Sequence, residues 1–148
     1  TPGDIVCDLY GGVGLFTMPI TKKIGNEGHV HLVEISNHSV RDAFKIFKDY
    51  NNVSIHRGSV DRKLPKINNI DIIVLDPPRS GAGKKVIGQI ISKKPRAVVY
   101  ISCDPASLAR DAKFLYDSGY KLDKIKAVDL FPMTHHIECI VRFIPSTN

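Results

Sequence analysis

Two short apolar runs place the strongest constraint on how this chain can fold. Ile72–Leu75 and Ala97–Ile101 each end in polar residues that are followed by proline. An apolar run of this length, bounded by turn residues, fits a strand that is buried on both faces of a parallel sheet. Asp76 and Cys103 then lie just beyond the strand ends, at the edge where open α/β sheets bind their ligands. The sequence therefore predicts an α/β fold with a functional site at that edge.

Strand and helix signals alternate along most of the chain, which predicts a layered fold with a mostly parallel sheet. Three further strands are predicted, at Ile5–Leu9, Val30–Val33 and Val53–His56. The last two predicted strands, Leu122–Leu130 and Ile137–Ile144, have no helix between them. Two strands joined by a short loop are usually antiparallel, so we expect the sheet to end in a hairpin.

Helices are predicted between the earlier strands, and one of them ends near Ile24. Pro19 lies awkwardly within that helix, so we expect a late start or a kink. Asp104 is expected to cap the last helix, which Pro105 opens. Apolar stripes at helical spacing are predicted to face the sheet at Val40, Ala43, Phe44 and Phe47, at Val86, Ile87, Ile90 and Ile91, and at Leu108, Ala112 and Leu115.

Composition narrows the functional classes. A length of 148 residues with 43% hydrophobic residues indicates one domain, and no apolar run nears the roughly 20 residues of a membrane span. The three cysteines are widely spaced and odd in number, which argues against a disulfide framework and against a zinc site. We therefore expect a cytoplasmic monomer without a metal. The net charge of +6 is compatible with a nucleic-acid partner but does not identify one, because the basic residues are scattered.

A glycine-rich stretch, Asp8–Gly14, follows the first strand and opens a helix. Glycines allow the backbone to approach a ligand closely, and Glu34 ends the second strand about 20 residues later, where a carboxylate binds ribose hydroxyls. A dinucleotide fingerprint would need a third glycine where Thr17 stands. The pattern therefore favours a cofactor other than a dinucleotide, and Asp8 suits one with a cationic amino-acid tail.

Cys103 lies between a strand and a helix, whereas Cys7 and Cys139 lie within apolar strands and are predicted to be small buried hydrophobes. The positive end of the helix favours the nucleophilic thiolate, although Asp104 opposes this. The layout of seven strands that end in a hairpin resembles that of the class I S-adenosylmethionine-dependent methyltransferases, and a thiolate beside their methyl donor suggests methylation of an unreactive carbon such as C5 of uracil. The thiolate adds to C6, C5 attacks the methyl group, and a base then removes the C5 proton.

Candidates for that base lie in the final hairpin, where Phe131–Glu138 contains His135, His136 and Glu138. With this segment, the chain resembles the catalytic domain of the RNA uracil-5-methyltransferases, which make 5-methyluridine in transfer and ribosomal RNA. The motifs that carry the resemblance occur in the same order and span nearly the whole chain, at Asp8–Gly14, Asp76–Gly81, Ser102–Pro105 and Phe131–Glu138.

The resemblance implies a class I methyltransferase fold, a Rossmann-like sheet of seven mostly parallel strands with an antiparallel hairpin at the C-terminal end. It implies S-adenosylmethionine as the cofactor and tRNA or rRNA as the partner. It assigns Cys103 as the nucleophile and Glu138 as the general base, and Pro77, Arg79 and His135 as substrate contacts. The cofactor contacts that it implies are Asp8, Tyr10, Gly12, Gly14, Leu15, Glu34, Ser59 and Asp76.

Two alternatives from other classes stay open. Asp76–Arg79 is similar to the Asp-Pro-Pro-aromatic motif of amine methyltransferases, except that Arg79 has no aromatic ring. The chain could also be a basic domain that binds cofactor or RNA without turnover. A cytosine-5 target is disfavoured, because those RNA enzymes usually carry a second cysteine after the proline of the fourth-strand motif.

Members of the family carry further sequence before the first strand, often an RNA-binding barrel. We therefore expect residues 1–148 to be the catalytic domain of a longer protein, without its N-terminal RNA-binding region. By itself this domain is expected to bind S-adenosylmethionine weakly and to lack turnover.

Overall fold

The computed structural model describes residues 1–128 and 138–146 of the chain. The strands are β1 (Ile5–Leu9), β2 (His29–Glu34), β3 (Val53–Arg57), β4 (Ile72–Leu75), β5 (Ala97–Ser102), β6 (Tyr120–Val128) and β7 (Glu138–Pro145). The helices are α1 (Thr17–Ile24), α2 (Asn37–Ile46), α3 (Val60–Lys63), α4 (Gly83–Ser92) and α5 (Pro105–Asp117), and a single 3₁₀ turn (Leu64–Lys66) follows α3.

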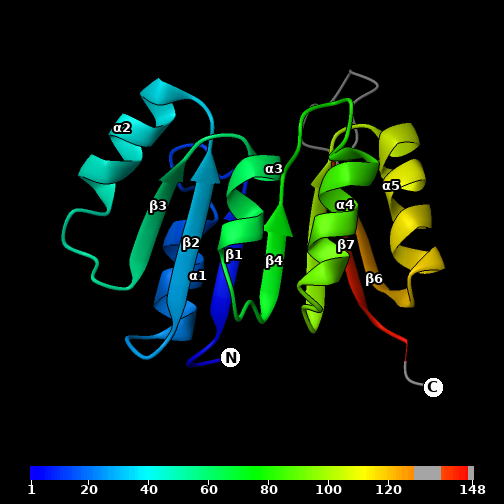
Figure 1. Ribbon diagram of the computed structural model, residues 1–148, viewed down its shortest axis with the longest axis horizontal. Coiled ribbons are helices and arrows are strands. Elements are labelled where there is room, and N and C mark those ends of the chain that lie inside the picture. Colours follow the sequence, from blue (N-terminus) through cyan, green and yellow to red (C-terminus); the bar gives the residue numbers. More distant parts are fainter. Residues whose placement is uncertain (129–137, 147–148) are drawn as a thin grey trace.

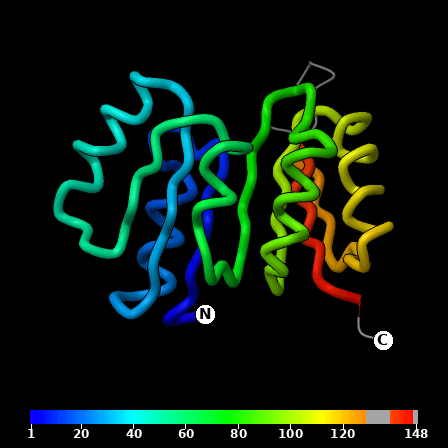
Figure 2. Tube along the Cα trace, viewed as in Figure 1, coloured from blue at the N-terminus to red at the C-terminus, as the bar shows by residue number. Residues whose placement is uncertain are grey.

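The strands form one seven-stranded sheet in the order β3-β2-β1-β4-β5-β7-β6 (Figure 1). β1 to β5 are mutually parallel, whereas β7 runs antiparallel to both β5 and β6. This arrangement confirms the predicted class I methyltransferase fold and its antiparallel C-terminal hairpin. Figure 2 shows the path of the chain, in which β1, near the N-terminus, lies in the sheet between β2 and β4.

Helices cover both faces of the sheet. α3, α4 and α5 pack on the face that carries Leu9, Ile73 and Leu75, and these residues belong to the largest buried cluster of the described chain. α1 and α2 pack on the opposite face, where Val30 and Leu32 of β2 are fully buried. Burying both faces of the central strands explains why their sequences are apolar without alternation.

Local sequence signals explain where the helices begin and end. α1 begins at Thr17, so Pro19 lies in the first turn, where the missing N–H would have no helical partner. Gly25 ends this helix with φ 71°, a left-handed value that glycine adopts readily. The predicted cap of α5 is confirmed, because the Asp104 carboxylate accepts a hydrogen bond of 2.7 Å from the Ser107 N–H.

Two helical features differ from the predictions. Phe44, predicted to be buried, is 55% exposed, while Val40, Ala43 and Phe47 of the same stripe are buried as expected. α2 lies at the β3 edge of the sheet, so its buried stripe is narrower than on a helix over the centre. α3 was not predicted, because four residues are too short for a helical period to be read from sequence. In the described part of the chain, no helix has both the length and the apolar character needed to cross a membrane.

Candidate active site

The carboxyl ends of the parallel strands form one edge of the sheet. β1 and β4 end level with each other, at Leu9 and Leu75, and the adjoining β2 ends at Glu34. Tyr10 and Asp76 therefore follow β1 and β4 at the same edge as Glu34. This is the ligand-binding edge of open α/β sheets, so the predicted residues lie where the topology places a site.

The glycine turn after β1 is tied to the end of β2. The Gly12 N–H donates a hydrogen bond of 2.9 Å to Glu34 Oε2, and the Ser36 N–H donates one of 2.6 Å to Oε1. Gly14 has φ 99°, and a Cβ there would come within 2.3 Å of Phe47. Only glycine therefore allows the turn to pack this closely against α2. A carboxylate can accept about four hydrogen bonds, so Glu34 keeps acceptor capacity for ribose hydroxyls.

Asp8 lies beneath this turn and does not line the pocket described below. It is fully buried, and its Oδ2 accepts a hydrogen bond of 2.6 Å from the Thr17 hydroxyl. Its Oδ1 is buried without a hydrogen-bond partner among the described residues. Burial, with a smaller effect of the charges on Asp76 and Glu34, raises the pKa of Asp8 to about 6, although the bonds from Thr17 oppose the shift. Asp8 thus supports the turn from below.

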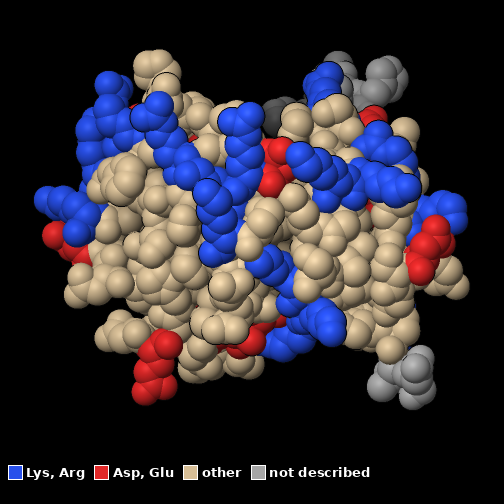
Figure 3. Space-filling view, in the orientation of Figure 1, with Lys and Arg blue, Asp and Glu red and all other residues tan. Residues whose placement is uncertain are grey.

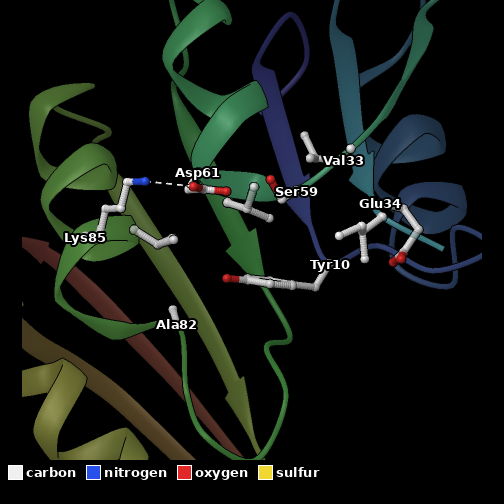
Figure 4. Close-up of a pocket in the computed structure, with 11 residues that line it drawn as sticks. Tyr10, Val33, Glu34, Ser59, Asp61, Ala82 and Lys85 are labelled. Carbon is white, nitrogen blue, oxygen red and sulfur yellow. Dashed lines mark hydrogen bonds and ion pairs between the residues drawn. The ribbon is translucent and has the colours of Figure 1, made fainter.

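A pocket of about 300 Å³ opens above Tyr10, between the ends of β2 and β3 and the start of α4 (Figure 4). Its walls combine apolar side chains with a few polar groups, which is typical of small-molecule sites. Burial raises the pKa of Tyr10 to about 12, so its ring enters the pocket as a neutral phenol. The pocket is lined by Tyr10, Val33, Glu34, Ile35, Gly58, Ser59, Val60, Asp61, Ala82, Lys85 and Val86.

Three of the predicted cofactor residues, Tyr10, Glu34 and Ser59, line this pocket together. Asp61 and Lys85 also line it and were missed. They form an ion pair of 2.8 Å, and the bond from Lys85, with a further one from Ser59, lowers the pKa of Asp61 to about 2. The pair joins α3 to α4, two segments that no local sequence pattern connects.

Cys103 lies at the other end of the same edge, half-buried between β5 and α5. Ser102 and Asp104 fix the turn that contains it, because the Ser102 hydroxyl donates to the Asp104 carbonyl at 2.9 Å and accepts from the Asp104 N–H at 3.1 Å. Hydrogen bonds from Ser107 hold the pKa of Asp104 below its usual value, with smaller contributions from the charges of Arg110 and Arg79. The turn that contains Cys103 is therefore held by hydrogen bonds between its two neighbours, and the charges of Arg110 and Arg79 reach Asp104.

Glu138 is brought to the same place by the antiparallel direction of β7. The last pair between β5 and β7 joins Ser102 to Cys139. Continued by one residue, this register sets Glu138 opposite Cys103. Partial burial and the negative charge of Glu138 both raise the pKa of Asp76. A thiol and two carboxylates thus gather at the rim formed by β4, β5 and β7.

A buried network fixes the loop between these two regions. Asp111 of α5 is fully buried, and its Oδ2 accepts hydrogen bonds from the Tyr100 hydroxyl at 2.8 Å, the Ala82 N–H at 2.7 Å and the Gly83 N–H at 3.1 Å. The Arg110 guanidinium donates to the other oxygen at 2.9 Å. Asp111 was missed, although a charged residue within an apolar stripe is a signal that could have found it.

The remaining predicted residues are more dispersed. Leu15 is 74% exposed and does not line the pocket. Pro77 is buried and Arg79 is exposed on the loop after β4. His135 and His136 lie outside the described residues. Within the described part of the chain, no group of three or more His, Cys, Asp or Glu side chains is arranged to hold a metal ion.

Comparison with known proteins gives a consistent assignment. A sequence profile of the tRNA (uracil-5-)-methyltransferase family matches residues 2–144. Two uncharacterized RNA methyltransferases, from Streptomyces avermitilis and Streptomyces coelicolor, are 44% and 40% identical, each over 99% of this chain. The chain spans only 34% and 32% of the length of these two relatives.

Among solved structures, the tRNA (uracil-54, C5)-methyltransferase of Pyrococcus abyssi, in complex with S-adenosylhomocysteine, superposes with a TM-score of 0.83 at 29% identity. The match covers 97% of this chain and 35% of that protein. Aeropyrum pernix fibrillarin with bound S-adenosylmethionine, at 17% identity and a TM-score of 0.74, shares the fold over 97% of this chain and 67% of its own. The chain has the fold of the S-adenosylmethionine-dependent methyltransferases, and it belongs to the tRNA (uracil-5-)-methyltransferase family.

Proposed function

We propose that this chain is the catalytic domain of an RNA methyltransferase that transfers a methyl group from S-adenosylmethionine to C5 of a uridine in tRNA or rRNA. The observation that carries the proposal is the β5–β7 register, whose last pair is Ser102 with Cys139. The residues next to this pair, Cys103 and Glu138, are therefore expected at the same edge of the sheet as the cofactor-sized pocket. Membership of the uracil-5 family supports the same reaction.

The pocket fits the cofactor that the fold family uses. Glu34 offers a fixed carboxylate for ribose hydroxyls, and the apolar walls with Ser59 suit a purine ring. Asp8, with an unpartnered buried oxygen, contributes by shaping the glycine turn. When bound, S-adenosylmethionine supplies an electrophilic methyl group on a sulfonium. Asp76, with its raised pKa, is proposed to contact the cofactor or the target base.

The residues of this chain then carry out the remaining steps. The thiolate of Cys103 forms a bond to C6, and the electron pair of the C5–C6 double bond shifts to give a nucleophilic, enolate-like C5. After C5 has taken the methyl group, Glu138 removes the C5 proton. The electrons of that C–H bond restore the double bond and expel the Cys103 thiolate, which regenerates the enzyme.

Substrate contacts are proposed on the loop after β4 and in the final hairpin. Arg79 is exposed at this edge of the sheet, and its charge reaches Asp104 beside the thiol, so it is suited to a phosphate or a base edge. Pro77 shapes the loop after β4, and His135 is assigned a substrate contact by the family resemblance.

Tritium release from RNA labelled at C5 of uridine tests the proposal in the full-length protein. Carbon methylation expels one tritium for each methyl group transferred. Cys103→Ala is expected to lose both tritium release and methyl transfer. Cys139→Ala, which removes a thiol next to Glu138, is the matched control and is expected to keep both. Methyl transfer without tritium release would point to amine methylation through Asp76–Arg79. Binding of S-adenosylhomocysteine without any methyl transfer to RNA would point to a non-catalytic domain.

A further inference from the structure

A second, basic hollow lies directly beside the cofactor pocket and shares Ile35, Gly58 and Ser59 with it. Its volume is about 650 Å³. We call it the basic groove, and its other lining residues are Asn37, Arg57, Arg62, Lys63 and Lys66. Four of these five side chains carry a positive charge, and they come from the end of β3, from α3 and from the 3₁₀ turn after it.

None of these four cations takes part in the ion pairs found among residues 1–128 and 138–146. Asp61 of the same helix is engaged by Lys85 at 2.8 Å. Unpaired like charges around a hollow repel one another and concentrate a positive potential there. An anion bound in the groove would relieve this repulsion.

The groove is also built into the backbone. Gly58 has φ 145°, and a Cβ at this position would come within 2.6 Å of Lys63 Cε. The stem of Lys63 therefore lies across the Gly58 backbone, which fixes the lysine on the wall of the groove. Burial lowers the pKa of the neighbouring His56, and the charge of Lys63 lowers it further.

Basic side chains are prominent on this face of the molecule. Figure 3 shows lysine and arginine over the region of α2 and α3, with few acidic side chains among them, and a further group over the region of α4 and α5. Ile35 is the one large apolar side chain in the lining of the groove. A protein partner would need apolar or aromatic anchors there, whereas arginine and lysine are the usual contacts of nucleic-acid phosphates.

We propose that the basic groove binds backbone phosphates of the RNA substrate, on the β3 side of the cofactor pocket. This inference rests on the proposed function, because it takes RNA as the partner. The groove lies toward the opposite end of the site edge from Cys103 and Glu138. It therefore contacts nucleotides other than the target uridine and contributes affinity more than base selection.

The experiment measures binding of a short, fluorescently labelled, single-stranded RNA containing uridine at several salt concentrations, in the full-length protein. Arg62→Ala with Lys66→Ala removes two cations of the groove. Lys121→Ala with Lys124→Ala is the matched control, because β6 is the opposite edge strand of the sheet and both lysines are exposed. The groove variant is expected to reduce the slope of log affinity against log salt by about 1.4, since each single-strand phosphate contact contributes about 0.7. The control is expected to keep the wild-type slope.

Equal effects of the two variants would show a general charge effect and overturn the proposal, as would unchanged RNA binding by the groove variant.

Calorimetry with S-adenosylhomocysteine gives the second measurement. Unchanged cofactor affinity in the groove variant supports the proposal, whereas loss of cofactor affinity with normal RNA binding overturns it. Tritium release separates the two claims. If RNA binding depends on the groove but no tritium is released, the proposed reaction alone is refuted. If tritium is released but RNA binding does not depend on the groove, the proposal for the groove alone is refuted.

Discussion

Asp8 is a carboxyl group whose ionised form is poorly compensated in the folded chain. It is fully buried, it receives one side-chain hydrogen bond from Thr17, and its Oδ1 has no partner in the described structure. Its pKa is raised from 3.8 to about 6. A raised pKa means that the folded state binds a proton more tightly than the unfolded state. Its contribution to stability is therefore present below about pH 4 and lost as the pH rises through about 6.

Asp8→Asn is expected to become more stable than the wild type as the pH rises from about 4 to about 6. The difference should level off above that at about 3 kcal/mol or less, because one pKa unit corresponds to about 1.4 kcal/mol. Urea unfolding of both proteins across this range is the measurement. Asp49→Asn, at an exposed position, serves as the control. A stability difference that does not change with pH would contradict the account of Asp8.

Glu138 is assigned the removal of the C5 proton, a step that follows addition of Cys103. Glu138→Gln should therefore still form the covalent bond to RNA but fail to release it, so that methylated RNA stays attached to the protein in a denaturing gel. Turnover is expected to fall by about 10²- to 10⁴-fold, the usual contribution of a general base. Glu27→Gln, at an exposed position far from the site, should turn over normally. Rapid release of methylated RNA by Glu138→Gln would identify a different base.

At the scale of elements, the bounds of a strand could be predicted best where residues typical of turns mark its end in the sequence. β1 and β4 have the predicted bounds, because turn residues or prolines follow their apolar runs. The antiparallel hairpin was also predicted, but β6 begins two residues earlier than expected, since the exposed residues of this edge strand lack a buried pattern.

The site was predictable where its residues follow strand ends and unpredictable where segments distant in sequence meet. Tyr10, Glu34 and Ser59 line the pocket because each follows or ends a parallel strand. The Asp61–Lys85 pair and Asp111 depend on how α3, α4 and α5 pack against each other. That packing is a property of the tertiary structure, and it cannot be predicted from the periodicity of apolar residues in the sequence.

The Asp111 network fixes the start of α4 and the loop after β4, so its loss should affect both stability and the site. Asp111→Ala leaves the Ala82 and Gly83 N–H groups and the Tyr100 hydroxyl without their acceptor, and it is expected to lose about 3 kcal/mol of unfolding free energy. Tyr100→Phe removes the hydroxyl that donates to Asp111 at 2.8 Å and accepts from the Ala82 N–H at 3.3 Å, but this N–H keeps its bond to Asp111, so the loss should be about 1 kcal/mol. Denaturant unfolding of the wild type and both variants measures these two losses of unfolding free energy.

The effect on the site is measured separately from stability. At a temperature where both variants remain folded, Asp111→Ala should raise KM for RNA more than Tyr100→Phe does, because only the former frees the loop that carries Pro77 and Arg79. Equal unfolding free energies for Asp111→Ala and wild type would rule out the network as the support of this loop.

At the scale of the whole molecule, one edge of the sheet collects all parts of the proposed reaction. The parallel strands β1, β2 and β3 bring the cofactor pocket to this edge, and β5 brings Cys103. β7 runs in the opposite direction, so its first residue, Glu138, meets the carboxyl end of β5. A parallel seventh strand would present its last residues there instead. The antiparallel hairpin is therefore the topological feature that brings the proposed base to the end of the strand that precedes the proposed nucleophile.

The most direct measurement of this account is the site of covalent attachment to RNA containing 5-fluorouridine. Fluorine at C5 cannot be removed as a proton, so the adduct formed by the nucleophile persists after methyl transfer. Incubation of the full-length protein with such RNA and S-adenosylmethionine, followed by nuclease and protease digestion and mass spectrometry, is predicted to give a nucleotide adduct on the peptide that contains Cys103. Absence of any adduct under conditions of active methyl transfer, or an adduct on Cys139 instead, would contradict the account.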